Sequence, residues 1–369
     1  MTVYGFLLVW AIAIMFLSSM FVNFTYSYDK YEGKVVRSKW LVAILAFLPV
    51  IIVAGMRQNV GDTGIYRNGF LELSGDISGI GNIIVNTSKD KGFAVLQVLI
   101  KAIIGNNATL FFLLIAAFQG GCILAVYKKY SCDFAMSLFL FIASADYISW
   151  MFNGMRQFIA VAITFASTGL VLKRKYIPAV ALTLLAATIH ASALIVLPII
   201  FIVRGKAWNK RTVFVVASIV LLIAMFDRFT PILENLLQNT QYDGVMGDEL
   251  WITDDGTSFF RTLVYSIPAI LSVICLKFIR NEDDPIVNLA TNMSIVSAFL
   301  YVLSSFTSGI YIGRLPIYFS LYGYILLPWL IRNCFTERSA KLVKIGMVFS
   351  YICYYYYQMC ITWSFDLFK

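Results

Sequence analysis

The sequence has little of what soluble enzymes commonly use for chemistry. It has one histidine in 369 residues, and its six cysteines are scattered without the Cys-x-x-Cys spacing of a zinc site. A Gly-rich phosphate loop of the form GxxxxGK[ST] is also absent from the sequence. Zinc hydrolases and P-loop ATPases are therefore poor candidates, and we expect neither a metal ion nor a cofactor.

Charged residues are scarce as well. Only 13% of the chain is charged and 60% is hydrophobic, whereas a soluble domain has about 25% charged residues and close to half apolar ones. The surplus of apolar residues predicts an integral membrane protein. The net charge of +9 then reflects membrane topology rather than binding of nucleic acid, because basic residues concentrate in cytoplasmic loops.

Apolar runs long enough to cross a membrane, which takes roughly 20 residues of helix, fill most of the chain. We expect ten crossings, near 3–22, 40–56, 108–127, 134–152, 154–172, 212–228, 261–279, 286–304, 309–331 and 342–361. The short stretch 92–104 carries Lys101, and the long stretch 176–203 has basic clusters on both sides. Each predicts a re-entrant or broken element. The sequence therefore predicts an all-α polytopic protein with one transmembrane domain over residues 1–369.

The distribution of charge predicts the orientation. With the N-terminus outside, the inner loops hold 19 Lys and Arg against 7 Asp and Glu, and the outer side holds 10 against 13, as the positive-inside rule requires. The two sizeable loops, 57–91 and 229–260, then lie outside. Because every cytoplasmic loop is short, we expect any chemistry to occur in the membrane or on the outer face of a bacterial plasma membrane.

Three arginines lie at the end of an apolar span or within its outer third. The tetrapeptide Gly-Met-Arg-Gln occurs twice, with Arg57 and Arg156 at the outer ends of two spans, and Arg314 lies in the outer third of a third span. Charge at this depth is costly unless a cavity or a partner stabilises it. Guanidinium groups bind phosphate oxygens in bidentate fashion, so three that converge would form a diphosphate site. The alternative is that each arginine extends to lipid headgroups.

Other polar residues at membrane depth are candidates for the same site. Asp146 lies near the end of the 134–152 span, and either binds substrate or forms a structural ion pair. His190 is in the middle of 176–203, roughly 21 Å of helix from either end, and is either a catalytic base or a hydrogen-bonded core residue. Asp62 lies in a Gly-containing loop with Tyr66, and this loop either folds over a ligand or is a plain interfacial turn.

Several of these pieces resemble the EpsG family, a branch of the Wzy-type polysaccharide polymerases of bacterial membranes. The matching residues occur in the expected order: Arg57 with Gly61-Asp62-Thr63 and Tyr66, Gly92-Phe93, Asn153-Gly-Met-Arg156-Gln157, Ile189-His190-Ala191-Ser192, and Arg314 with Tyr318. The sequence departs from the family at Lys89-Asp90-Lys91, where an acidic residue and a proline often precede the Gly-Phe pair. Asp90 is a candidate substitute for that acid.

The resemblance implies an enzyme that joins oligosaccharide repeat units carried on undecaprenyl diphosphate, on the outer face, for a capsule, exopolysaccharide or O-antigen. Such an enzyme needs cations for the diphosphate leaving group and a base for the acceptor hydroxyl. We assign the diphosphate to the three arginines, and phosphate or sugar contacts to Asn153, Gln157, Tyr66, Tyr318 and Asp146. His190 or Asp62 is the base, with His190 preferred for its ordinary pKa. The expected partners are the lipid-linked oligosaccharide, membrane lipid, a chain-length regulator and a flippase.

Two other classes of protein fit parts of this pattern. A transporter or flippase for lipid-linked sugars also places arginines in a cavity among broken helices, but whole spans are not repeated here beyond the doubled tetrapeptide. A membrane acyltransferase with His190 as base would need a conspicuous inner-face site, and the inner loops are short. A ligase that transfers finished glycan is closer still, and the sequence does not separate it from a polymerase.

Overall fold

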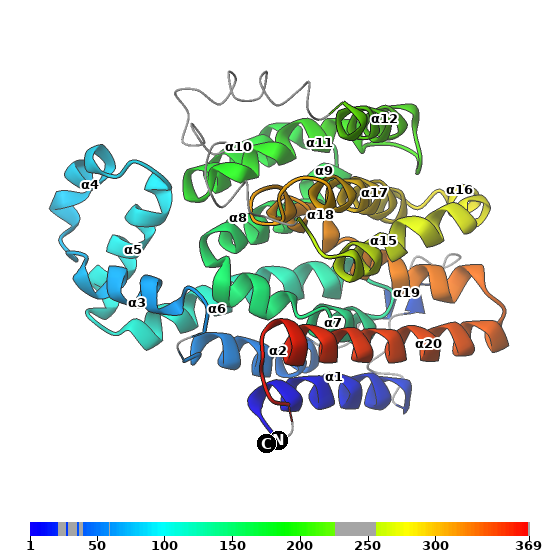
Figure 1. Ribbon diagram of the computed structural model, residues 1–369, viewed down its shortest axis with the longest axis horizontal. Helices are drawn as coiled ribbons and strands as arrows, with labels where there is room; N and C mark the ends of the chain where they lie inside the picture. Colours follow the sequence, from blue (N-terminus) through cyan, green and yellow to red (C-terminus); the bar gives the residue numbers. More distant parts are fainter. Residues whose placement is uncertain (21–26, 29–34, 37–39, 59, 226–255, 368–369) are drawn as a thin grey trace. The chain divides into compact units, whose positions relative to one another are not determined.

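The computed structural model describes the chain except for residues 21–26, 29–34, 37–39, 59, 226–255 and 368–369 (Figure 1). The described residues are almost entirely helical. The strands among them are two antiparallel pieces of two residues each, β1 (Ser27–Tyr28) and β2 (Val35–Val36). The expectation of a helical fold is therefore confirmed. The contacts divide the chain into two compact units.

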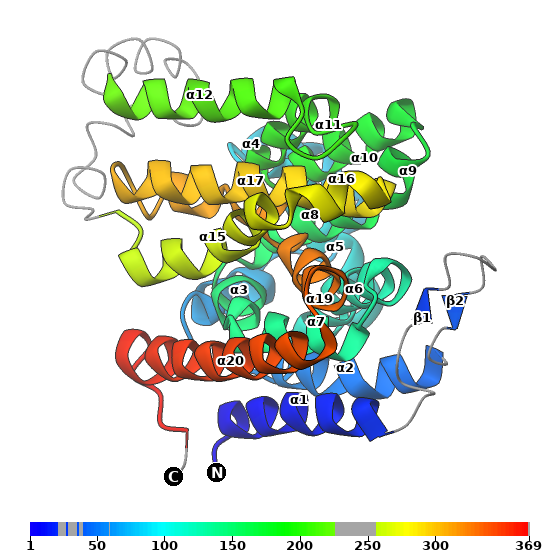
Figure 2. The ribbon, with the colours of Figure 1, turned by 90° about the vertical axis from the view of Figure 1, so that its right-hand side faces the viewer.

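The first unit comprises Met1–Leu194 and Ile331–Lys369. Its helices are α1 (Val3–Met20), α2 (Trp40–Gly55), α3 (Thr63–Glu72), η2 (Ile77–Gly79), α4 (Ile80–Asn86), α5 (Lys91–Ile104), α6 (Ala108–Tyr130), α7 (Phe134–Ala143), η3 (Tyr147–Asn153), α8 (Met155–Ala166), α9 (Thr168–Leu172), α10 (Tyr176–Ile189), α20 (Glu337–Tyr356) and η7 (Tyr357–Thr362). Helices α1 and α20 run side by side in both views (Figures 1 and 2), and the Tyr355 hydroxyl donates to the Tyr4 carbonyl at 2.8 Å. The ends of the chain meet where the Thr2 N–H donates to the Leu367 carbonyl.

The second unit is Ile195–Leu330. Its helices are α11 (Val196–Ile202), α12 (Lys210–Ala224), α15 (Phe259–Ile274), α16 (Leu276–Glu282), α17 (Pro285–Ser305), η6 (Ile312–Arg314) and α18 (Ile317–Ser320), while η4 (Ala191–Ile195) and α19 (Gly323–Cys334) cross the boundaries between the units. Helix α17 forms the core of this unit. Its Asn292 amide donates to the carbonyls of Val203 and Lys206, which fixes the turn after α11.

Three helical segments among the described residues are long and apolar enough to span a membrane: Ala108–Tyr130, Met155–Leu172 and Pro285–Ser305. Three further spans are possible if each of three bent helix pairs is one span, which gives up to six. These segments coincide with expected crossings and give the chain the character of a helical membrane protein. The total of ten crossings stays a prediction.

The bent pairs differ from the straight spans that the sequence predicts. Helices α7 and η3 meet at 70°, α15 and α16 at 71°, and the η6–α18 segment meets α19 at 50°. At the first break Ala145 has a φ of 59°, a left-handed conformation that an α-helix cannot contain. Apolar composition reveals that a segment is buried, but it carries little information about one left-handed residue within it. That is why the sequence analysis missed this break.

The segment 57–91, expected as an outer loop, contains the helices α3, η2 and α4. The buried Lys101 of α5 explains how α3 is held. Its Nζ donates to the carbonyls of Phe70 and Leu71 at 2.7 and 2.8 Å, and so satisfies carbonyls at the C-terminal end of α3. The second expected outer loop, 229–260, lies largely outside the described residues.

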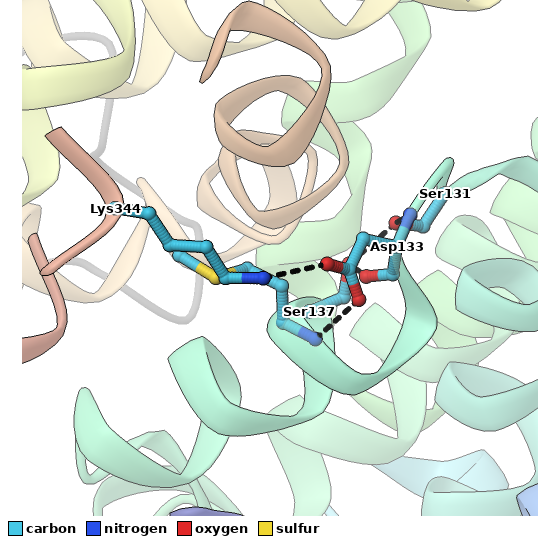
Figure 3. Close-up of polar contacts among 5 residues, drawn as sticks. Ser131, Asp133, Ser137 and Lys344 are labelled. Carbon is cyan, nitrogen blue, oxygen red and sulfur yellow. Dashed lines mark hydrogen bonds and ion pairs between the residues drawn. The ribbon is translucent and has the colours of Figure 1, made fainter. Parts of the chain in front are cut away.

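Within the first unit, helix α20 is tied to the start of α7 by a polar contact (Figure 3). The Asp133 carboxylate caps α7 by accepting the Met136 N–H at 3.0 Å, and Lys344 of α20 lies 3.2 Å from its other oxygen. The Ser137 hydroxyl donates to Ser131 beside it. This contact joins the segments that follow α6 and α19, which the charge distribution assigns to the same inner side of the membrane.

Candidate functional site

The ends of five helices meet at one place in the first unit. Helix α2 ends there, α3, α5 and α8 begin there, and α10 ends there. The two copies of the Gly-Met-Arg-Gln tetrapeptide are in direct contact, because Arg57 of the first copy donates through a terminal guanidinium nitrogen to the Met155 sulfur of the second, at 3.0 Å. The sequence analysis placed Arg57 and Arg156 at the same depth, and the structure brings their two segments together.

Arg57 is buried, with 5% of its surface exposed. Besides Met155, its guanidinium donates to the Thr63 hydroxyl and to the Ala54 carbonyl, and it lies 4.2 Å from the ring centre of Phe112. All of these partners are neutral, and among the described residues Arg57 forms no ion pair with a carboxylate. A buried cation without a counter-ion raises the local potential, which favours an anionic ligand nearby.

The charge of Arg57 is reinforced by Arg67 on α3. One guanidinium nitrogen of Arg67 lies 3.4 Å from the Arg57 carbonyl, and both guanidinium groups face the Phe112 ring. Burial lowers the pKa of Arg57 to about 10, while Tyr66 opposes this shift and the charge of Arg67 adds to it. Arg57 is therefore still a cation at neutral pH. The structure thus places a second guanidinium beside it that the sequence analysis did not single out.

Asn153 fixes the turn that follows Arg57. Its side-chain oxygen accepts the N–H of Asp62 at 3.1 Å. Gly61 has a φ of +54°, and a Cβ at this position would lie 2.5 Å from the same Asn153 oxygen. Glycine is required here for two reasons. Residues with a side chain rarely adopt this backbone conformation, and there is no room for a Cβ atom. Asn153 therefore holds the Gly61–Asp62 turn against the start of α8, and Tyr66 lies one turn further along the chain.

Arg156 lies on the first turn of α8 and is shared between two partners. One guanidinium nitrogen is 2.9 Å from the Asp90 carboxylate, and the Tyr66 ring centre is 5.8 Å from the guanidinium carbon. The Arg156 side chain is 41% exposed and that of Asp90 is 10% exposed. Asp62 is also near enough to interact electrostatically with Arg156. The arginine is therefore held in place and still accessible to a ligand.

Asp90 comes immediately before α5 in a left-handed conformation, with a φ of 55°. Its carboxylate accepts the N–H of Ala191 in addition to pairing with Arg156. Burial raises the pKa of Asp90 above its ordinary value, although Arg156, the Ala191 N–H and Lys89 oppose that rise. The contact between α5 and α10 depends on Gly92, because a Cβ there would collide with Thr188. The Asp90-x-Gly92 sequence thus brings the end of α10 against the carboxylate.

His190 lies where α10 ends. Its backbone is extended, with φ and ψ of −153° and 116°, and its Nδ1 is 2.7 Å from the Ser192 hydroxyl. Because the next residue, Ala191, binds Asp90, the structure brings the histidine segment to the pair formed by Asp90 and Arg156. His190 is therefore next to the residue that binds Asp90, at the end of α10 rather than within a continuous helix.

The other candidates lie elsewhere or are deeply buried. Gln157 is 2% exposed within α8. Asp146 is fully buried at the break before η3, where it is close enough to Tyr127 and Tyr351 to interact with them electrostatically. Arg314, which is exposed, and Tyr318, which is buried, belong to the second unit. The hydrogen bonds and ion pairs around Arg57 and Arg156 therefore join Arg57, Asp62, Tyr66, Asn153, Arg156 and His190 into one cluster. Arg67 and Asp90 belong to the same cluster through their contacts with Arg57 and Arg156.

Two residues were missed or undervalued by the sequence analysis, namely Arg67 and Asp90. Arg67 is adjacent to Tyr66 in a segment expected to be a loop, and it carried no motif that could have identified it. The Nε atoms of Arg67 and Arg156 are buried and have no hydrogen-bond partner among the described residues. A buried donor without a partner costs roughly 1–3 kcal/mol. A ligand atom that accepts from such a donor would remove that cost.

The cluster contains three guanidinium groups and two carboxylates, Asp62 and Asp90. Within the part of the chain that the structure describes, no group of three or more His, Cys, Asp or Glu residues is arranged to hold a metal ion. Because guanidinium groups outnumber carboxylates in it, the cluster is suited to bind an anion. Together with the apolar helices, it defines a helical membrane protein with an electropositive site where several helices end.

The comparison with protein families identifies the chain more closely. The family model described as the EpsG family matches residues 40–365, which is most of the chain. The chain therefore belongs to the EpsG family, which is associated with Wzy-type polysaccharide polymerases. No curated protein and no solved structure matches it.

Proposed function

We propose that this protein polymerises a bacterial polysaccharide by joining oligosaccharide repeat units carried on undecaprenyl diphosphate, and that it releases undecaprenyl diphosphate. The observation that carries the proposal is the group of Arg57, Arg67 and Arg156, of which Arg156 alone is in a recorded ion pair among the described residues. Membership of the EpsG family supports the same reaction. The reaction requires no nucleotide, because the diphosphate on the donor is the leaving group.

The reaction is a substitution at the anomeric carbon of the donor repeat unit. An acceptor hydroxyl forms the new C–O bond, the bond from the anomeric carbon to the diphosphate oxygen breaks, and a base takes the hydroxyl proton. Negative charge develops on the departing diphosphate, and fixed cations that already face this position lower the barrier. Arg67 and Arg156 each have a buried Nε–H without a partner among the described residues, so we assign direct contacts with the diphosphate to them.

The base is His190 or Asp62. In the tautomer in which Nδ1–H donates to Ser192, Nε2 carries the lone pair that a base needs. The ordinary pKa of histidine also lies closer to neutral pH than that of aspartate. Asp90 has a different role in this proposal, since it holds the Arg156 guanidinium while the site is empty and yields it when the diphosphate binds.

The remaining assignments follow from the sequence. For Arg314 and Tyr318 we keep the assignments made from the sequence, which are a contact with the diphosphate and a contact with phosphate or sugar. Asn153, Gln157, Tyr66 and Asp146 position the substrate or the loops around it. The site faces the outside of the bacterial plasma membrane, where lipid-linked repeat units are exposed. A flippase that delivers those units and a chain-length regulator are the proposed protein partners.

Purified protein that is given a synthetic polyprenyl-diphosphate oligosaccharide without nucleotide sugar tests the proposal. We expect a gel ladder spaced by one repeat unit. Arg156→Ala should abolish the ladder and leave single repeat units on the lipid, while Arg338→Ala, an exposed arginine at the start of α20, should not. Normal polymer from Arg156→Ala would refute the assignment of the site. Flux of the lipid-linked saccharide across vesicles, without any ladder, would favour a transporter.

A further inference from the structure

An apolar groove of about 630 Å³ lies in the first unit between α5, α6, α8 and α10. This volume is within the range of roughly 300–1,000 Å³ that is typical of ligand sites. Its walls are almost entirely aliphatic or aromatic, with residues such as Leu99, Leu114, Phe118, Ile159 and Leu185. Leu99, Leu114, Phe118 and Leu185 are each at least 42% exposed, so the groove is open along its side rather than enclosed.

The groove begins at the cationic cluster. Its lining includes Lys91 and Gly92, which directly follow Asp90, and Ile189, which directly precedes His190. It also includes Ile159, which lies one turn after Arg156 on α8. The pair formed by Asp90 and Arg156 therefore borders one end of the groove, and Lys91 adds another cation there.

The helices carry the groove away from the cluster in one direction. Helices α5 and α8 begin at the cluster and α10 ends there. Along α5 the lining runs from Gly92 to Ile100, over which a helix advances about 12 Å. The arrangement therefore has a cationic end and an apolar channel that leads away from it. It is complementary to a molecule with an anionic head and an apolar tail.

We propose that this groove seats the first part of the polyprenyl tail of the lipid carrier whose diphosphate binds at the cluster. The inference rests on the proposed function for the nature of the head group and adds the path by which the tail leaves the site. The side opening lets the carrier enter from the bilayer without passing through water. The part of the tail beyond the groove stays among the membrane lipids.

The charge at the end of the groove indicates which kind of ligand occupies it. An apolar tail gains little by moving from lipid into an apolar groove, because the bilayer is just as apolar. The selection must therefore come from the head group, and a diphosphate matches a cluster of guanidinium groups better than the single phosphate of a phospholipid. A partner helix would fill the groove but would leave the buried Nε–H of Arg156 without an acceptor.

A bulky side chain in the groove separates binding of the tail from binding of the head. We compare Leu99→Trp with Ile103→Trp, one turn further along α5, where Ile103 is 85% exposed and outside the groove. Leu114→Trp and Leu110→Trp form the same kind of pair on α6, since only Leu114 lines the groove. Equilibrium binding of undecaprenyl diphosphate and of inorganic pyrophosphate is measured for each full-length variant in lipid nanodiscs.

We expect both groove variants to weaken binding of undecaprenyl diphosphate by about tenfold or more, as expected for an overpacked site, and to keep the wild-type affinity for pyrophosphate. That retained affinity also shows that the variants fold. The two control variants should match the wild type with both ligands. Unchanged binding of undecaprenyl diphosphate in the groove variants, or its equal displacement by phosphatidylglycerol, would overturn the inference.

The same measurements separate this inference from the proposed function. A wild-type protein that binds undecaprenyl diphosphate in a groove-dependent way but forms no polymer would keep the tail site and refute the polymerase. A protein that forms polymer while the groove variants bind the lipid normally would keep the polymerase and refute the tail site. If the wild type bound neither ligand, the anion site itself would be wrong, and the inference would fall with it.

Discussion

Replacement of Arg67 tests most directly whether the guanidinium cluster binds diphosphate. The sequence analysis named Arg314 as the third arginine, whereas the contacts within the first unit group Arg67 with Arg57 and Arg156. Arg67→Ala removes the charge and the buried Nε–H that has no partner among the described residues. Arg67→Lys keeps the charge but loses the planar fork of donors.

The size of the effect follows from the contacts. A hydrogen bond to a charged group contributes about 1.5–3 kcal/mol, so the loss of one such bond to the diphosphate weakens binding by roughly 10- to 150-fold. The empty protein should respond differently, because the charge of Arg67 disfavours the charged form of its neighbour Arg57. Removal of that repulsion should leave the free energy of unfolding unchanged or slightly higher. Lower affinity without lower stability is therefore the expected signature.

Binding of a labelled polyprenyl diphosphate in nanodiscs and thermal unfolding of the empty protein measure the two quantities separately. Arg67→Lys should have an intermediate affinity, and Arg338→Ala should match the wild type in both assays. Arg314→Ala, measured alongside, tests the assignment made from the sequence. Wild-type affinity in Arg67→Ala would refute the reasoning, because the proposed function assigns this residue a direct contact with the diphosphate.

Three further predictions follow from the contacts of α5. Because burial raises the pKa of Asp90, its carboxylate loses its charge at a higher pH than an ordinary aspartate as the solution is acidified. Arg156 then has no competing carboxylate, so polyprenyl diphosphate should bind more tightly there, and Asp90→Asn should remove this pH dependence from the measured Kd. Gly92→Ala should lower the free energy of unfolding by about 1–3 kcal/mol, because its Cβ meets Thr188. Gly81 has open space around it, so Gly81→Ala should leave the free energy of unfolding unchanged. Lys101→Met should cost about 2 kcal/mol or more of the free energy of unfolding in detergent, since two α3 carbonyls lose their donor; an unchanged midpoint would contradict this.

The sequence predicted those residues of the site whose positions follow from their expected depth in the membrane. Arg57 and Arg156 stand at the ends of apolar runs, and the topology expected from hydropathy and from the charge distribution places both ends at the same side of the bilayer. The doubled tetrapeptide strengthened that expectation, and the contact between Arg57 and Met155 shows the two segments touching. Similarly, the apolar stretch 176–203 with a central histidine predicted an interrupted element, and α10 does end at His190.

The residues that the sequence did not reveal depend on tertiary packing. Arg67 reaches the cluster because α3 packs against α6, where the rings of Phe70 and Phe111 stack at 4.3 Å, and because Lys101 holds the end of α3. No local pattern encodes this arrangement. Asp90 reaches Arg156 through a left-handed backbone conformation, which an aspartate adopts more readily than most residues. The only hint in the sequence was its position before Gly92.

The guanidinium groups have different environments, and this suggests that they have different roles in binding an anion. Arg57 is surrounded by a carbonyl, a hydroxyl, a sulfur atom and aromatic faces, which satisfy its donors without cancelling its charge. Its field therefore extends into the site, although its own donors are engaged. Arg156 is the reverse case, because its charge is balanced by Asp90 while its Nε–H has no partner among the described residues. In the proposed reaction, an incoming diphosphate would replace Asp90 at Arg156 and meet the uncompensated field of Arg57. The site without ligand would then be stable, and the anion would still gain from binding.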